Sequence, residues 1–145
     1  MELHQLFYIQ SQLDKKIAIN HELHKKNLIP SKTLALLVEL GELANETRCF
    51  KYWSLKEPSP RDKILEEYVD CLHFILSIGL DKGYIIANID MKQKEIDPTD
   101  LFQEVFAKVL RFREEESQNI YIELFEDFLS LGNLLCFKSE DIFNA

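Results

Sequence analysis

The chain has 145 residues and carries 25 acidic against 17 basic side chains, which gives a formal net charge of −8. This length fits one domain and is sufficient to bury a core without a disulfide or a metal. The acidic balance disfavours binding to a nucleic-acid backbone or an anionic membrane, because both require a basic surface. We therefore expect a globular protein that does not act on nucleic-acid polymers.

The three cysteines and the apolar segments argue against a disulfide-rich, zinc-thiolate or membrane-spanning protein. Cys49, Cys71 and Cys136 lack any CxxC spacing, so the sequence indicates neither a disulfide framework nor a thiolate zinc site. No secretory signal is recognisable at the N-terminus. The most apolar run, residues 71–80, is far shorter than the roughly 20 residues that span a membrane. We expect a cytoplasmic protein without a membrane anchor.

Apolar residues recur at spacings of three and four, which is typical of helices, and no alternating pattern of useful length predicts a strand. A first helix is expected over about residues 2–27. Pro30 and Ser31 should interrupt this helical pattern, and Ser31 is then the expected N-cap of a second helix that ends near Cys49. Residues 50–60 form an aromatic connector that ends in two prolines.

The second half of the chain continues the helical pattern. Three further helices are expected over residues 61 to about 80–83, about 99–115 and about 118–135. A short segment at 84–95 separates the first two of these, Asp97 opens the next helix, and residues 138–145 resemble the start of another. Because no repeat or domain boundary is visible, we predict a single all-α domain over 1–145, a helical bundle of about five to six helices with a four-helix core.

Polar residues interrupt the apolar face of the helix expected from residue 61. Asp70, His73 and Ser77 align along one face, and Glu67 extends this line by one turn. A buried carboxylate costs several kcal/mol unless another group compensates it. The pattern is compatible with a partly solvated groove or with a binding site.

A second acidic pair, Glu39 and Glu42, lies within an apolar run on the preceding helix, and Glu46 continues the row. Four carboxylates cannot face one another while ionised unless a cation lies between them. Magnesium prefers oxygen ligands and is commonly shared between carboxylates and substrate phosphates. We therefore predict a Mg²⁺ cluster of Glu39, Glu42, Glu67 and Asp70 that holds a phosphorylated ligand.

Gln10 and Asp14 occupy positions on the first helix where apolar residues would be expected. An amide is suited to reading a neutral base, although satisfying a buried backbone group is its commoner use. The connector aromatics, including Trp53, either close one end of the bundle or form a stacking wall for a base, with Lys51 beside them for a phosphate. His73 alone is more often a satisfied core histidine, but its position one turn from Asp70 makes it a candidate ligand contact.

These residues occur in four stretches that resemble the all-α (MazG-like) nucleoside triphosphate pyrophosphohydrolases, and most closely the dimeric dUTPases. The matching stretches are 10–14 (QSQLD), 39–45 (ELGELAN), 50–54 (FKYWS) and 66–74 (EEYVDCLHF). The acidic pairs alone are typical of the superfamily. The connector and the LHF that follows Asp70 are similar to the narrower family.

The resemblance implies a homodimer that hydrolyses dUTP, and also dUDP, in a Mg²⁺-dependent reaction; dUTP gives dUMP and pyrophosphate. It implies that the four acidic residues are metal ligands and that Glu39 or Glu42 orients or deprotonates the attacking water. Gln10 and Asp14 match positions that read uracil, and Trp53 matches a position that packs on the nucleoside. The family continues into a basic phosphate-binding tail, which we expect to be absent because this sequence ends at Ala145.

Three alternatives remain open from the sequence. A related pyrophosphohydrolase acting on dCTP or on a damaged nucleotide would share the acidic pairs. A di-iron bundle requires an ExxH motif on each of two helices, whereas this chain has only one related motif, at Asp70 and His73. A non-enzymatic interaction module would use the carboxylates only for solvation.

Overall fold

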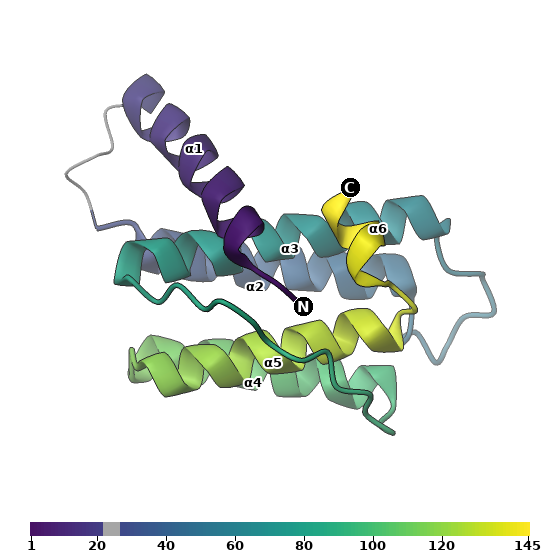
Figure 1. Ribbon diagram of the computed structural model, residues 1–145. Coiled ribbons are helices and arrows are strands. Elements are labelled where there is room, and N and C mark those ends of the chain that lie inside the picture. The colour runs from purple at the N-terminus through teal and green to yellow at the C-terminus, as the bar shows by residue number, and fades with distance from the viewer. Residues whose placement is uncertain (22–26) are drawn as a thin grey trace.

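The computed structural model describes residues 1–21 and 27–145, and these residues form an all-α bundle (Figure 1). Its helices are α1 (His4–His21), α2 (Ile29–Thr47), α3 (Arg61–Lys82), α4 (Pro98–Glu114), α5 (Gln118–Leu134) and α6 (Ser139–Phe143). The predicted fold class is therefore confirmed. None of the helices in the described part of the chain is both long and apolar enough to cross a membrane.

The start of α2 differs from the sequence-based expectation. Pro30 does not separate the two helices but lies in the first turn of α2, where its missing N–H is not needed. The N-cap is Leu28 and makes no side-chain cap hydrogen bond, so the prediction of Ser31 as N-cap is wrong. The sequence predicts a first helix that reaches residue 27; α1 is described to His21, and residues 22–26 lie outside the described residues.

Side chains cap α4 and α5, and the start of α4 at Asp97 is the one that the sequence predicts. Asp97 accepts a hydrogen bond from the backbone N–H of Thr99 (2.9 Å), and Ser117 accepts one from Ile120 (3.2 Å). The irregular segment 83–97, which precedes α4, crosses the bundle and pairs with the N-terminus through a single bridge between Glu2 and Asn88.

Two lysines that bind one buried aspartate fix segment 83–97 to the bundle. Lys94 from this segment and Lys108 from α4 both bind Asp127 of α5, at 2.9 and 2.8 Å. Burial alone would raise the pKa of Asp127, but the hydrogen bonds from both lysines outweigh it and hold that pKa below its ordinary value.

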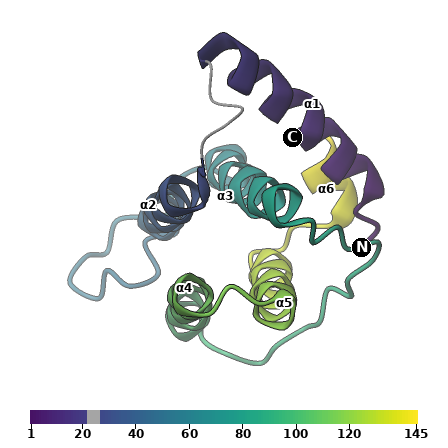
Figure 2. The same ribbon diagram turned by 90° about the vertical axis from the view of Figure 1, so that its left-hand side faces the viewer.

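Helices α2 to α5 form the four-helix core, seen nearly end-on in Figure 2, whereas α1 and α6 lie outside it on the side of α3. The outer half of α1 leans away from the bundle (Figure 1). Its apolar residues Leu13 and Ile17 consequently remain about two-fifths exposed, at 39% and 43%. The splayed α1 leaves a space beside α3 that contains the candidate site.

Two reciprocal tyrosine–glycine contacts join α3 to α5. Tyr68 of α3 lies over Gly132 and donates to the Phe128 carbonyl (2.9 Å), while Tyr121 of α5 lies over Gly79 and donates to the Ile75 carbonyl (2.7 Å). Each tyrosine precedes the glycine of its own helix by the same interval, from 68 to 79 and from 121 to 132. A β-carbon on either glycine would lie 2.3 Å from the opposing hydroxyl. These contacts fix the position of α3, which carries most of the site.

We expect Gly79→Ala to destabilise the protein by about 1–3 kcal/mol, because the added methyl displaces Tyr121 from a closely packed contact. Gly41→Ala is the matched control: Gly41 also lies within a helix, but beyond its own helical backbone no atom of the described residues lies within 4 Å of the position that its added β-carbon would take. That control should gain about 0.5–1 kcal/mol from the higher helix propensity of alanine. Urea unfolding measures both changes, and equal stability of the two variants would contradict the packing described.

Candidate functional site

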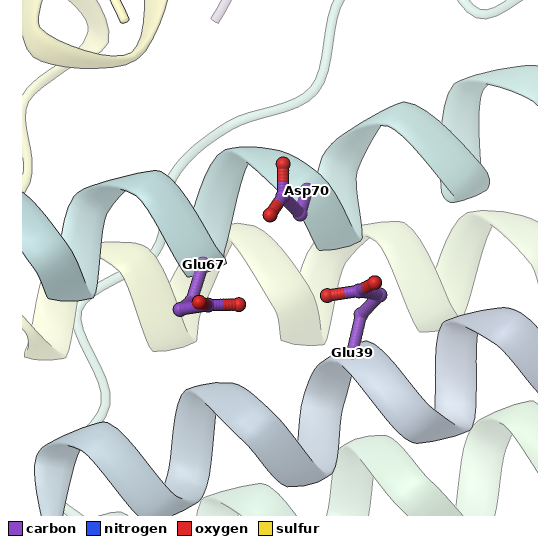
Figure 3. Close-up of side chains that lie close together, drawn as sticks. All are labelled: Glu39, Glu67 and Asp70. Atoms are coloured by element: carbon purple, nitrogen blue, oxygen red, sulfur yellow. The ribbon is translucent and has the colours of Figure 1, made fainter.

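Three carboxylates from two neighbouring helices face a common space. The periodicity of α2 buries Leu36, Leu40 and Leu43 and places Glu39 beside this stripe, toward α3. There Glu39 meets Glu67 and Asp70, and one oxygen from each of the three lies within 4.8 Å of the others (Figure 3). We call these three residues the carboxylate cluster. The predicted approach of the two acidic pairs is therefore present in the structure for three of the four residues.

The fourth predicted residue, Glu42, lies one turn further along α2 and is exposed. It is outside the cluster, but its carboxylate is close enough to Glu39 to raise the pKa of that residue. Glu42 therefore lies at the solvent side of the cluster. Glu46, which continues the row, accepts a hydrogen bond from the Ser59 hydroxyl and is used to hold the connector.

The electrostatics of the cluster oppose full ionisation. Burial, followed by a hydrogen bond to Glu42 and the charges of Glu42, Asp70 and Glu67, raises the pKa of Glu39 to about 7. Burial also raises the pKa values of Glu67 and Asp70, although Lys63 and His73 respectively counteract part of the effect. The folded protein therefore holds negative charges together at a free-energy cost.

The donor atoms of the cluster fit a hard divalent cation. Glu39 Oε2 and Glu67 Oε2 are buried, and among the described residues neither has a hydrogen-bond partner. Buried polar atoms are normally paired, so two orphaned carboxylate oxygens on facing helices indicate a missing ligand. An all-oxygen, all-carboxylate donor set suits Mg²⁺ better than a softer transition metal.

A pocket of about 410 Å³ lies between α1 and the α2–α3 pair, and two members of the cluster, Glu39 and Asp70, line it. Asp70, His73 and Ser77 line the pocket along α3, which confirms that they share one face. Gln10 and Asp14 line it from α1. Its apolar lining comes from Leu13, Ile17, Ala18, Leu28 and Phe74. The pocket thus combines an acidic end with a mainly apolar space of the size that holds a small ligand.

A chain of hydrogen bonds crosses from α3 to α1 inside this pocket. His73 Nδ1 donates to Gln10 Oε1 (2.6 Å), Gln10 Nε2 donates to Asp14 Oδ1 (2.9 Å), and Ser77 Oγ donates to Asp14 Oδ2 (2.7 Å). Gln10 is only 4% exposed, so its position on the apolar stripe is explained by these partners. After these bonds, one Gln10 N–H and further lone pairs on Asp14 remain for a ligand.

The residues of the connector, 50–60, do not line this pocket. Trp53 is 63% exposed and packs edge-on against Tyr52 and Phe50, with ring centroids 5.2 and 6.0 Å away. Lys51 Nζ lies 5.8 Å from the centre of the Phe50 ring. Of the described residues that line the pocket, none belongs to the connector. The structure therefore does not bring Lys51 or Trp53 together with the other predicted residues.

Two contacts are not predicted by the sequence analysis. The sequence identifies Ser77 only as part of a polar line, whereas in the structure it anchors Asp14. Lys63, which pairs with Glu67 at 3.1 Å, is absent from the predicted site residues. Its position four residues before Glu67 on the same helix is the signal that could have identified it.

We expect the metal-free protein to lose stability as the pH rises through about 7. The pKa of Glu39 is about 7 in the folded protein, against an ordinary value of 4.5. Between these two pH values the folded state holds a proton that the unfolded state releases, so stability falls as the pH rises. Glu39→Gln removes this titrating group and should therefore reduce the dependence of stability on pH. Thermal unfolding in chelator from about pH 5 to about pH 8 tests this, and parallel profiles for the two proteins would contradict it.

Comparison with known proteins agrees with this geometry. A family model described as dUTPase matches residues 2–145, nearly the whole chain and every residue of the cluster and pocket. No curated protein matches the chain. The match favours an enzyme over a non-enzymatic helical module. The chain therefore belongs to the dimeric all-α dUTPase family and is an enzyme of the dUTP diphosphatase type.

Proposed function

We propose that this protein hydrolyses dUTP to dUMP and pyrophosphate, and also accepts dUDP, in a Mg²⁺-dependent reaction at the carboxylate cluster. The observation that carries the proposal is the meeting of Glu39, Glu67 and Asp70, two of which have buried oxygens that no described residue hydrogen-bonds. In dUTP hydrolysis, a water oxygen bonds to the α-phosphorus, and the bond from that phosphorus to the α–β bridging oxygen breaks. The electron pair of the broken bond leaves with pyrophosphate.

In this proposal Glu39, Glu42, Glu67 and Asp70 hold the metal. Bound magnesium supplies charge neutralisation at the phosphate oxygens and lowers the pKa of a coordinated water. Glu39 or Glu42 orients the attacking water and accepts its proton. The exposed position of Glu42 beside Glu39 supports a role at the water-accessible side of the site.

We assign base recognition to the α1 side of the pocket. Uracil presents a carbonyl acceptor beside the N3–H donor, and the free N–H of Gln10 with the carboxylate of Asp14 offers the complementary pair. Cytosine in the same pose would direct its N3 lone pair at the carboxylate. His73 holds the Gln10 amide in this orientation through its 2.6 Å hydrogen bond.

The remaining assignments rest on the resemblance to the family. Trp53 would pack on the nucleoside and Lys51 would contact a phosphate, which requires the connector to approach the ligand from outside the pocket. We further propose that residues 1–145 act as a single catalytic domain in a cytoplasmic homodimer. The apolar side chains exposed on α2 and α4 support a second copy as partner: Leu34, Val38 and Leu110 are 49–62% exposed.

Substituting a proposed metal ligand should strongly reduce turnover without unfolding the protein. We expect Asp70→Asn and Glu42→Gln to reduce pyrophosphate release from dUTP by roughly 10²–10³-fold, because each removes charge that the reaction requires. Glu57→Gln, an exposed acid of the connector, is the matched control and should retain activity. Pyrophosphate assays with Mg²⁺ or chelator, together with circular dichroism, measure both effects; persistent turnover in chelator would overturn metal dependence.

Base specificity provides a separate test. Asp14→Asn replaces one acceptor oxygen with a donor, and the mismatch with uracil N3–H should cost about 1–3 kcal/mol. We expect kcat/KM to fall about 10- to 100-fold for dUTP and less for dCTP. Gln12→Ala, on the exposed face of α1, is the control. Equal turnover of dUTP and dCTP by the unmodified enzyme would favour the related pyrophosphohydrolase with another base preference.

A further inference from the structure

Lys63 places a positive charge beside the carboxylate cluster. Its Nζ lies 3.1 Å from Glu67 Oε1 and 3.7 Å from Glu66 Oε2. Among the ion pairs formed by the described residues, this is the one that reaches a member of the cluster. The other oxygen of Glu67, Oε2, is buried and has no hydrogen-bond partner in the described part of the chain. Glu67 thus turns one oxygen toward Lys63 and leaves the other for a cation.

The groups along α3 follow the order of the parts of a nucleoside triphosphate. Ser77 and His73 line the nucleoside end of the pocket, Asp70 and Glu67 belong to the cluster, and Lys63 follows on the opposite side. A helix rises about 1.5 Å per residue, so Lys63 lies about 10 Å along the axis from Asp70 and Ser77 lies about 10 Å the other way. With the base at Ser77 and the α-phosphate at the cluster, the β- and γ-phosphates extend toward Lys63.

The ion pair with Glu67 uses only part of the Lys63 ammonium. The Lys63 side chain is 44% exposed, whereas that of Glu67 is 9% exposed, so the lysine end of the pair remains in contact with solvent. An ammonium has three N–H donors, of which Glu67 uses one at hydrogen-bond distance. The remaining donors are available at the edge of a strongly acidic site that would otherwise repel a polyphosphate.

We propose that Lys63 is the residue that binds the phosphates leaving as pyrophosphate, an assignment that rests on the proposed function. Its donors contact oxygens of the β- and γ-phosphates, where negative charge accumulates as the bond to the α-phosphorus breaks. The nucleoside and the α-phosphate do not contact it. Lys63 therefore discriminates triphosphate and pyrophosphate from monophosphate.

The test compares Lys63→Met and Lys63→Arg with Lys82→Met. Lys82 is a control because it is a lysine at the other end of the same helix and forms an ion pair with Glu116 at 3.2 Å. Calorimetry in Mg²⁺ measures binding of inorganic pyrophosphate and, separately, of dUMP. We expect Lys63→Met to weaken pyrophosphate binding and raise KM for dUTP roughly 10- to 100-fold, with dUMP binding unchanged. Lys63→Arg should retain most of the affinity, and Lys82→Met all of it.

Pyrophosphate affinity within about twofold of the unmodified protein would overturn the assignment. Equal losses for pyrophosphate and dUMP would also overturn it, because Lys63 would then act only by positioning Glu67. The unchanged dUMP affinity expected for Lys63→Met also verifies that the variant is folded. If the unmodified protein released no pyrophosphate from dUTP, the proposed function itself would fail, and this outcome differs from a loss confined to the lysine variants.

Discussion

The repulsion between carboxylates brought together by α2 and α3 is the constraint on which the rest of the structure depends. Glu39, Glu67 and Asp70 meet in a half-buried space, where burial first, and then the charges of neighbouring carboxylates, raise their pKa values. A globular protein tolerates such a cost where the rest of the fold holds the groups in place and a ligand relieves it. In the proposed function a bound divalent cation would relieve this cost and let an acidic protein hold a polyphosphate.

The helix that carries most of this site is held from its other side. Tyr68 and Gly79 lock α3 onto α5 through reciprocal contacts with Gly132 and Tyr121. The opposite face carries the polar groups, in an order that runs from a lysine through two acids to a histidine and a serine. Because one rigid element positions all of them, their relative spacing is set by helix geometry rather than by loops.

Much of this arrangement follows from the sequence. Period-3.6 patterning predicts the helices, and acidic residues within apolar runs indicate the cluster before any contact is known. Local signals fail at Ser31, because a proline in the first turn is equally compatible with an earlier helix start. Contacts between distant segments, such as Ser77 with Asp14, depend on the crossing of α1 over α3, which a single sequence does not encode locally.

The sequence does not predict which way the side chains of the connector face. Trp53 and Lys51 belong to the most distinctive stretch of the resemblance, yet they lie outside the pocket, and Trp53 is mostly exposed. Composition indicates that aromatic residues gather there but not which way they face. Their proposed contacts with the ligand therefore rest on the family rather than on the pocket geometry.

The most direct test of the central claim is to locate a divalent cation experimentally. Crystals grown with Mn²⁺ in place of Mg²⁺ would reveal the ion by anomalous scattering. The account predicts a peak in contact with oxygens of Glu39, Glu67 and Asp70. Absence of a peak there, in crystals grown under conditions in which the protein hydrolyses dUTP, would contradict it.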